Sequence, residues 1–218
     1  AKKHAFLDTK EFLDMSYHGY IPFMKQFLLQ FKEPSLIEIG VDKGQTTIPL
    51  LHHLLMTRRT FNFRVIDIVA FKEVNTIINN FDKLPTQTFT YTLMNSLKYF
   101  ETDLSKNEKY DLVLVDGDHN YHTVSKELNA IKDMMSEKSI IILDDYSGRY
   151  AEEDFFYAAE DDARDVPGAT KFVMTEKHGV KTAVDEFVLT NSDWRAATLY
   201  KGEPVVLYRQ TSVGMNFL

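Results

Sequence analysis

Two apolar runs that end in acidic residues constrain the fold of this chain more than any other feature. Residues 113–115 lead into Asp116, and residues 140–143 lead into Asp144 and Asp145. Short continuous aliphatic runs are typical of strands covered on both faces, as in a parallel sheet, and ligands bind beyond the carboxyl ends of such strands. Three carboxylates in one crevice repel one another unless a cation or protons offset their charge. The two runs therefore predict a cation site formed by Asp116, Asp144 and Asp145.

The chain alternates between strand-like and helix-like segments, which indicates an α/β fold with a doubly wound, mostly parallel sheet. Near the C-terminus, two strand-like segments flank Lys201-Gly202-Glu203 and predict an antiparallel hairpin at or near one edge of the sheet. The predicted strands are 35–39, 63–68, 89–94, 110–115, 139–143, 195–200 and 204–209. The predicted helices are 6–15, 21–31, 46–57, 74–81, 123–135 and 180–190, with another near 155–163.

The composition fits a single soluble domain. With 218 residues, 44% of them hydrophobic, the chain can form one sizeable core. The net charge of −7 argues against a nucleic-acid partner, and the absence of cysteine excludes disulfides, thiolate zinc sites and cysteine nucleophiles. We find neither a signal peptide nor the run of roughly 20 apolar residues that spans a bilayer, so we expect a cytoplasmic protein without a membrane partner. Within the domain we distinguish an N-terminal helical lid (1–34), a cofactor-binding core (35–145), a substrate-side insert (146–179) and a C-terminal helix with the hairpin (180–218).

A glycine turn follows the first predicted strand. Gly40 and Gly44 lie where this strand meets the next helix, and glycine there lets the backbone turn tightly and approach a ligand. Their G-x-x-x-G spacing is neither the dinucleotide fingerprint nor a phosphate loop. Asp67 ends the second strand, at the distance of about 20 residues from the glycines where an acid holds a ribose diol. The pattern favours an adenosine ligand without a pyrophosphate, and S-adenosylmethionine fits, with Glu38 near its methionine end. The alternative is an ordinary tight turn and a solvated strand end.

Polar residues after two further strands each allow two interpretations. Asn95 and Ser96 follow the third strand, where they could hydrogen-bond the adenine or ribose of the cofactor. They could equally cap the next helix, because Asn and Ser are preferred caps. Asp118 follows the fourth strand, and for this residue we favour a helix cap over ligation of the cation.

Four segments resemble the class I S-adenosylmethionine-dependent methyltransferases, and most closely the cation-dependent O-methyltransferases of the macrocin (sugar) type. The resemblance spans residues 35–209 and implies a Rossmann-like, seven-stranded sheet. Its most specific part is the Asp-Gly-Asp-His sequence followed later by the Asp-Asp pair, whereas the glycine turn alone is weakly specific. Asp42 replaces the middle glycine of the commoner pattern. The four segments are 38–44, 114–121, 142–146 and 183–187.

The resemblance also implies roles for individual residues. Asp116, Asp144 and Asp145 match acids that bind a divalent cation at the ends of the fourth and fifth strands, and all-oxygen ligation suits Mg²⁺. His119 stands where the catechol and caffeoyl-type enzymes carry a lysine base, and histidine titrates in the right range for a general base. The candidate cofactor-binding residues are Glu38, Gly40, Gly44, Asp67, Asn95, Ser96 and Asp116.

The sequence therefore predicts an S-adenosylmethionine-dependent and Mg²⁺-dependent O-methyltransferase that acts on a small-molecule hydroxyl acceptor, such as a sugar, polyol or phenol. One alternative is a same-fold enzyme of other chemistry, by N-methylation or hydroxylase-like. Another is a non-catalytic cofactor-binding protein, which has no need of a costly carboxylate cluster. Segment 146–178 matches no pattern of the family. Its aromatic residues could line a substrate pocket or pack a lid helix onto the core, and the N-terminal helices could support a homo-oligomer.

Overall fold

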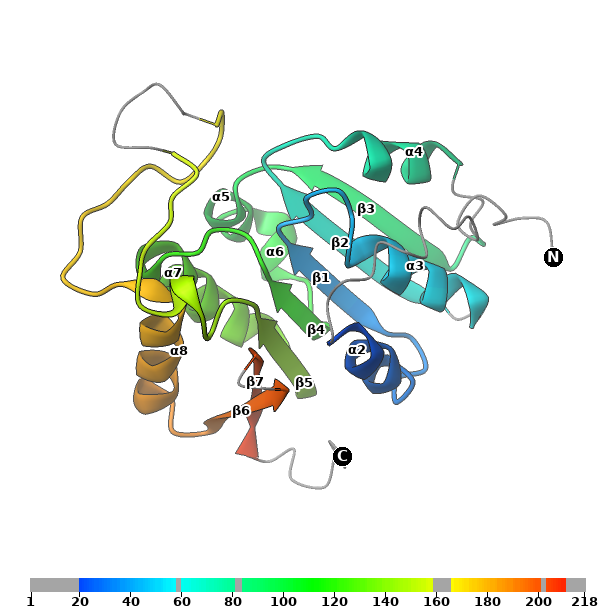
Figure 1. The fold of residues 1–218 in the computed structure, drawn as a ribbon. Helices are drawn as coiled ribbons and strands as arrows, with labels where there is room; N and C mark the ends of the chain where they lie inside the picture. Colours follow the sequence, from blue (N-terminus) through cyan, green and yellow to red (C-terminus); the bar gives the residue numbers. More distant parts are fainter. Residues whose placement is uncertain (1–19, 58–59, 81–83, 159–165, 201–202, 211–218) are drawn as a thin grey trace.

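Seven strands form one sheet in the order β3-β2-β1-β4-β5-β7-β6 (Figure 1). The computed structural model describes residues 20–57, 60–80, 84–158, 166–200 and 203–210. Strands β1 to β5 run parallel, β7 pairs antiparallel with β5, and β6 lies at the edge next to β7. The predicted doubly wound sheet and its C-terminal hairpin are confirmed. The strands are β1 (Ser35–Ile39), β2 (Phe61–Asp67), β3 (Gln87–Leu93), β4 (Tyr110–Val115), β5 (Met135–Leu143), β6 (Trp194–Tyr200) and β7 (Glu203–Arg209).

Helices cover both faces of this sheet (Figure 1). On one face lie α2 (Ile21–Leu28), α3 (Thr47–Met56) and α4 (Lys72–Asn80), whose buried apolar residues join one core cluster. The second cluster forms where α5 (Ser96–Phe100), α7 (Tyr121–Ile131) and α8 (Gly179–Thr190) pack on the other face. Both faces of the sheet are therefore buried from water. This explains why the sequences of the central strands are continuous apolar runs. Three short helices complete the described fold: α6 (Asp103–Lys106), η2 (Lys132–Met134) and η3 (Arg149–Ala151).

The register of the central strands brings their carboxyl ends to one level. Ile39 of β1 pairs with Val115 of β4, which pairs with Leu143 of β5. The Asp116 N–H continues this ladder by donating to the Ile39 carbonyl at 2.8 Å, and the Asp144 N–H donates to the Val115 carbonyl at 3.1 Å. The acidic residues that follow β4 and β5 are thus placed side by side by backbone geometry alone.

Two sequence-based expectations need correction. The helix predicted near residues 155–163 is wrong for its described part, because the Phe155 N–H donates to the His119 carbonyl at 2.9 Å in an isolated antiparallel bridge. The helix predicted over 123–135 ends at Ile131, and Met135 already belongs to β5, where it pairs with Tyr110. The remaining predicted elements are found with ends shifted by a few residues, and the short helices α5 and α6 were not predicted. The helix predicted over 6–15 lies outside the described residues. Among the described helices, none is long and apolar enough to cross a membrane.

Candidate active site

A cavity of about 350 Å³ opens at the carboxyl ends of β1, β2, β3 and β4. Its volume lies in the range of small-molecule sites, and its position is the one expected for a ligand of an open α/β sheet. Most of its wall is apolar, with a few carboxylates and small polar groups at one side. The residues that line it are Ile39, Gly40, Val41, Asp42, Ile66, Asp67, Ile68, Val69, Phe71, Met94, Asn95, Ser96, Asp116, Gly117, Asp118, Tyr157, Val166, Ala169 and Thr170.

The glycine turn brings β1 against the end of β4. Gly40 has a φ of +84°, and a Cβ built on it would lie 1.9 Å from the Asp116 carbonyl oxygen. No other residue fits there, because both the backbone conformation and the space require glycine. Gly44, with a φ of +85°, closes the turn by donating its N–H to the Val41 carbonyl at 2.8 Å. Gly40 lines the cavity, whereas Gly44 does not.

Asp67 fixes the opposite side of this turn. Its Oδ2 accepts from the Val41 N–H at 2.8 Å, and its Oδ1 accepts from the Val69 N–H at 2.8 Å. The carboxylate therefore ties the end of β2 to the glycine turn and lines the cavity with its charge. Each carboxylate oxygen can accept a second hydrogen bond, so these contacts leave room for ligand hydroxyls. Asp67 therefore lies at the cavity, and its predicted contact with a ribose diol stays a prediction.

Of the two roles left open by the sequence, Asn95 takes that of the helix cap, and its contact with a cofactor stays a prediction. Its Oδ1 accepts from the N–H groups of Leu97 and Lys98 and caps α5, while its Nδ2 donates to the Gly168 carbonyl at 3.1 Å. Ser96 is buried and donates to Glu127 Oε1 at 2.5 Å. Both residues also line the cavity.

Glu38 lies beneath the site rather than in the cavity wall. It is 2% exposed, and its Oε2 accepts from the Thr47 hydroxyl at 2.8 Å. Burial raises the pKa of Glu38 to about 8, so the side chain holds a proton at neutral pH. Since it does not line the cavity, direct contact with a cofactor is not apparent from the side-chain arrangement.

Asp116 and Asp144 face each other at the ends of β4 and β5. Burial raises the pKa of Asp116 well above its ordinary value, and the carboxyl of Asp144, to which it is hydrogen-bonded, raises it further. Tyr20 closes over this pair: burial, then Asp116 and Asp144, raise the pKa of its phenol. The arrangement favours a shared proton or a bound cation, because two carboxylates this close cannot both remain charged in a poorly solvated place.

Asp145 follows Asp144 and forms an ion pair with His119. Asp145 Oδ2 lies 2.7 Å from His119 Nδ1, and both side chains are mostly buried. Asp145 has a φ of +56°, in the left-handed region that costs about 1–3 kcal/mol for a residue other than glycine. Within the described part of the chain, no three His, Cys, Asp or Glu side chains gather as a metal-holding group. The three predicted ligands are therefore divided between a carboxyl pair and an ion pair.

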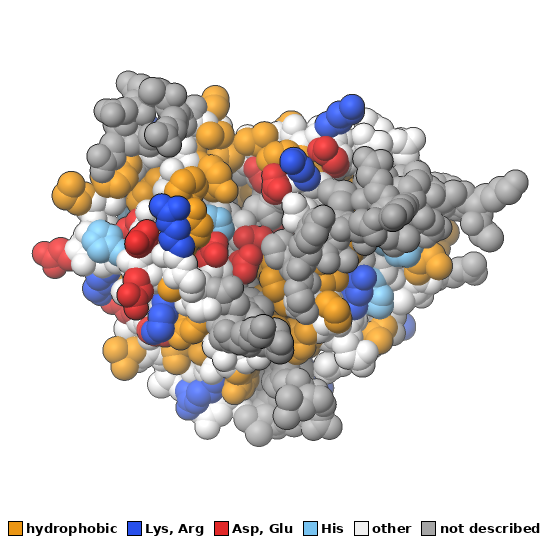
Figure 2. All heavy atoms as spheres, viewed as in Figure 1, with side chains coloured by type: hydrophobic (Ala, Val, Ile, Leu, Met, Phe, Trp, Pro, Cys, Tyr) orange, Lys and Arg blue, Asp and Glu red, His pale blue; other side chains and the backbone are white. Residues whose placement is uncertain are grey.

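His119 stands among aromatic rings contributed by residues 150–157. Its ring stacks on that of Tyr150, with centroids 5.2 Å apart and an angle of 14° between the planes. The rings of Phe155 and Tyr157 each lie 6.5 Å from it. Figure 2 shows acidic side chains near the middle of this face with hydrophobic ones beside them. The imidazole is thus held on one side by a carboxylate and on the other by aromatic faces.

Asp118 and Glu127 were not predicted as site residues, and Tyr157 was predicted only as one of the aromatic residues that could line a substrate pocket. Tyr157 lines the cavity, and Asp118 lines it too, with its Oδ2 accepting from the Thr123 hydroxyl at 3.0 Å. Asp118 was predicted to cap α7, but the residue that caps this helix is Asn120. Its side chain accepts from the Thr123 N–H at 2.8 Å. Glu127 is fully buried behind Ser96, and burial raises its pKa to about 8. A charged residue at an inward-facing position of α7 was the available sequence signal for Glu127.

Residues 37–146, half of the chain, match the family model of a methyltransferase domain. No curated protein matches the chain. A structure from Staphylococcus aureus, described as a candidate caffeoyl-CoA O-methyltransferase, has 13% identity and a TM-score of 0.54, over 95% of this chain and 91% of that one. The calicheamicin methyltransferase CalS11 has 12% identity and a TM-score of 0.57, over 96% and 83%. MnmC2 from Aquifex aeolicus has 12% identity and a TM-score of 0.58, over 90% and 60%. At these identities the three structures show a shared fold.

The cavity fits the cofactor of this family. Its apolar wall suits an adenine ring, and Asp67 provides the acid that a ribose diol needs beside the glycine turn. The family match covers β1 to β5, which carry the glycine turn and both acidic strand ends. This chain belongs to the methyltransferase-domain family and is a class I S-adenosylmethionine-dependent methyltransferase.

Proposed function

We propose that the chain transfers the methyl group of S-adenosylmethionine to a hydroxyl oxygen of a small molecule, with His119 as the general base. The observation that carries the proposal is the ion pair of His119 with Asp145 beyond the ends of β4 and β5, where His119 follows the cavity residue Asp118 and its ring lies 6.5 Å from that of the cavity residue Tyr157. A hydroxyl becomes a good nucleophile only as its proton leaves, so O-methylation needs a base within reach of the acceptor. An amine acceptor needs such a base much less, since its neutral form is already nucleophilic.

The pair with Asp145 prepares His119 for this role. With the Nδ1–H donated to Asp145, Nε2 is the acceptor nitrogen of the ring. Asp145 holds the imidazole in this tautomer and stabilises the positive charge that forms when the ring takes a proton. The stacked ring of Tyr150 restricts rotation of the imidazole out of this position. In this proposal Asp145 is a positioning residue rather than a ligand of a cation.

The cofactor would be held by the residues that line the cavity. Asp67 would accept from the ribose hydroxyls, and Asn95 and Ser96 would lie at the adenine edge. Ile68, Val69 and Phe71 would provide an apolar face for the base. When bound, S-adenosylmethionine supplies an electrophilic methyl group, and the remaining task of the protein is to align the acceptor and remove its proton.

The proposal includes a divalent cation at Asp116 and Asp144. Mg²⁺ is commonly held by one or two carboxylates, with waters and substrate oxygens completing six ligands, so a third carboxylate is not required. The raised pKa of Asp116 supports this assignment, because after burial its next cause is the neighbouring Asp144 carboxyl, whose repulsion a cation would offset. A cation bound there would lower the pKa of a coordinated substrate hydroxyl.

The test measures cofactor binding and turnover separately. Calorimetric titration with S-adenosylmethionine, with and without Mg²⁺, is expected to show binding to the wild type and to the variant His119→Ala. Methyl transfer to a panel of small hydroxyl compounds should be lost in His119→Ala and kept in His122→Ala, a histidine three positions further on α7. Mg²⁺ binding should be lost in Asp116→Ala. Turnover that survives in His119→Ala would show that this residue is not the base, and turnover that survives chelation would remove the cation from the proposal.

A further inference from the structure

Three rings next to His119 form what we term the aromatic platform: Tyr150, Phe155 and Tyr157. The Tyr150 and Phe155 centroids lie 5.5 Å apart, and Phe155 meets Tyr157 edge to face at 5.2 Å. Phe155 is held in register by its backbone bridge to His119. The platform is therefore fixed to the residue proposed as the base, through both rings and backbone.

The platform is open to solvent on one side and joined to the cofactor cavity on the other. Phe155 remains 37% exposed and Tyr157 41% exposed, although both are large apolar rings. Tyr157 also lines the cavity. A group of exposed rings beside a catalytic centre is costly in water and is a usual sign of a binding surface. A molecule resting on it would lie beside His119 and next to the cavity.

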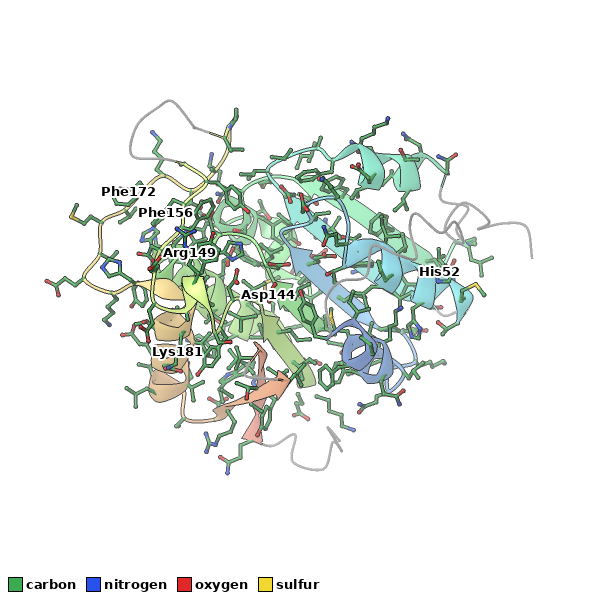
Figure 3. All side chains as sticks on the ribbon, viewed as in Figure 1. His52, Asp144, Arg149, Phe156, Phe172 and Lys181 are labelled. Atoms are coloured by element: carbon green, nitrogen blue, oxygen red, sulfur yellow. The ribbon has the colours of Figure 1, made fainter. Side chains whose placement is uncertain are left out.

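Phe156 gives an internal contrast, because its ring faces the other way. It packs edge to face on Phe172 at 5.2 Å, and in Figure 3 these two residues lie together at the outer edge of the view, away from Asp144. Alternate residues of an extended segment point to opposite sides, so Phe155 and Tyr157 face His119 while Phe156 does not. The three consecutive aromatic residues thus divide into two that can contact a ligand near His119 and one that cannot.

Negative charge surrounds the platform. Burial, and then Asp116, Asp118, Asp67 and Asp42, raise the pKa of the Tyr157 phenol to about 12. Residues 146–179 contain eight acidic and four basic residues. The Arg149 guanidinium lies 5.5 Å from the Tyr150 ring centroid and already pairs with Glu153, while His178 pairs with Asp154, the neighbour of Phe155. An anionic ligand would meet acids there and displace existing ion pairs.

We propose that the aromatic platform is the acceptor site, and that its ligand is a flat ring that bears the accepting hydroxyl and no negative charge. The inference rests on the proposed function and narrows it to one class of acceptor. Ring faces of Phe and Tyr bind flat apolar rings by offset or edge-to-face packing, and they attract cations. The surrounding carboxylates disfavour acceptors that carry a carboxylate or phosphate.

Binding of matched probes to the full chain tests this, measured by calorimetry in the presence of S-adenosylhomocysteine. The probes are phenol, tyramine, 4-hydroxyphenylacetate and cyclohexanol. Phenol and tyramine should bind, with 4-hydroxyphenylacetate and cyclohexanol weaker by about tenfold or more. Equal affinity for tyramine and 4-hydroxyphenylacetate, or for phenol and cyclohexanol, overturns the inference, as does the absence of binding by every ring.

Variants locate the site. Phe155→Leu keeps an apolar side chain of similar size but removes the ring, and should weaken tyramine binding by about tenfold, whereas Phe156→Leu should leave it unchanged. The affinity for S-adenosylhomocysteine, measured first, should be unchanged in both, which shows that each variant is folded. Equal effects of the two substitutions on tyramine binding would overturn the assignment of the aromatic platform as the acceptor site.

The two proposals can fail separately. If tyramine binds as expected but no hydroxyl compound is methylated, the proposed O-methyl transfer fails while the ring site stands. If turnover is found only on anionic or non-aromatic hydroxyl compounds, O-methylation stands and the platform fails.

Discussion

The two sides of the site are built in different ways. The cofactor side is held mainly by main-chain N–H groups, which donate to carbonyls at the ends of β1, β2 and β4, within the glycine turn, and to the Asp67 carboxylate. On the acceptor side, residues 146–158 and 166–178 contribute side chains from segments with little regular structure, and the contacts are rings and ion pairs. The family match ends at residue 146, where the second side begins.

The difference indicates which parts of the molecule can change. A backbone cradle tolerates few substitutions, because a single Cβ in the wrong place displaces a strand end. A surface of side chains can be altered residue by residue without moving the sheet, as binding loops on rigid scaffolds generally are. We therefore expect changes on the cofactor side to act on folding and cofactor affinity, and changes on the acceptor side to act on turnover and specificity.

The largest effect should come from Gly40→Ala. The new Cβ would lie 1.9 Å from the Asp116 carbonyl oxygen, so the ends of β1 and β4 must separate. We expect a loss of roughly 2–5 kcal/mol in the free energy of unfolding, from backbone strain and overpacking together. Cofactor binding should be lost as well. Urea unfolding and calorimetry measure the two effects.

Gly168→Ala is the matched control for that change. Gly168 also has a positive φ, of +93°, but a Cβ there would meet Ile68 at 3.6 Å, which is ordinary contact. Only the backbone strain remains, so its cost should be about 1–2 kcal/mol. Similar losses in the two variants would mean that the close approach of β1 to β4 is not what requires glycine at residue 40.

Next in size is Asp145→Asn, on the acceptor side. The amide can no longer stabilise a protonated His119, and it can offer its NH₂ group to Nδ1 and so favour the wrong tautomer. We expect kcat to fall by about 100-fold with unchanged affinity for S-adenosylmethionine. Kinetics at saturating cofactor measure the first and calorimetry the second. A large loss of Mg²⁺ binding in this variant would instead show that Asp145 is a ligand of the cation.

Asp67→Asn should have a smaller effect than Asp145→Asn, and it should lower cofactor affinity rather than kcat. The amide keeps one acceptor oxygen, so only one of the contacts with Val41 and Val69 is lost, together with the charge that a ribose diol would meet. We expect affinity for S-adenosylmethionine to fall by about 10-fold to 30-fold, as for a hydrogen bond to a charged group. At saturating cofactor, kcat should be close to that of the wild type. A fall in kcat with unchanged affinity for S-adenosylmethionine would show that Asp67 acts on turnover rather than on cofactor binding.

The same contrast explains what could be predicted from the sequence. The strands, the sheet and the positions of Gly40, Asp67 and Asp116 follow from apolar periodicity and from the rule that parallel strands end at one edge. The pairing of Asp145 with His119 does not follow, because it depends on a left-handed backbone at Asp145 that no local pattern indicates. The helix predicted near residues 155–163 did not anticipate that Phe155 and Phe156 point to opposite sides. Phe155 packs near His119 and Phe156 on Phe172, and these tertiary contacts cannot be read from the local sequence.

The last prediction concerns the pH dependence of stability, and its variant is Glu127→Gln, behind the cofactor side. The unfolded chain loses this proton near the ordinary pKa of 4.5, whereas the folded protein keeps it up to about 8. Between these values unfolding releases a proton, so rising pH lowers the free energy of unfolding by up to about 1.4 kcal/mol per pH unit from this group. Glutamine still accepts from Ser96 and carries no proton to lose, so the variant should show a flatter decline from pH 5 to pH 8. Urea unfolding across this range, with the exposed Glu101→Gln as a control, measures the difference. An unchanged slope in Glu127→Gln would mean that the folded protein holds Glu127 charged, and that Ser96 is positioned by a carboxylate rather than by a neutral acid.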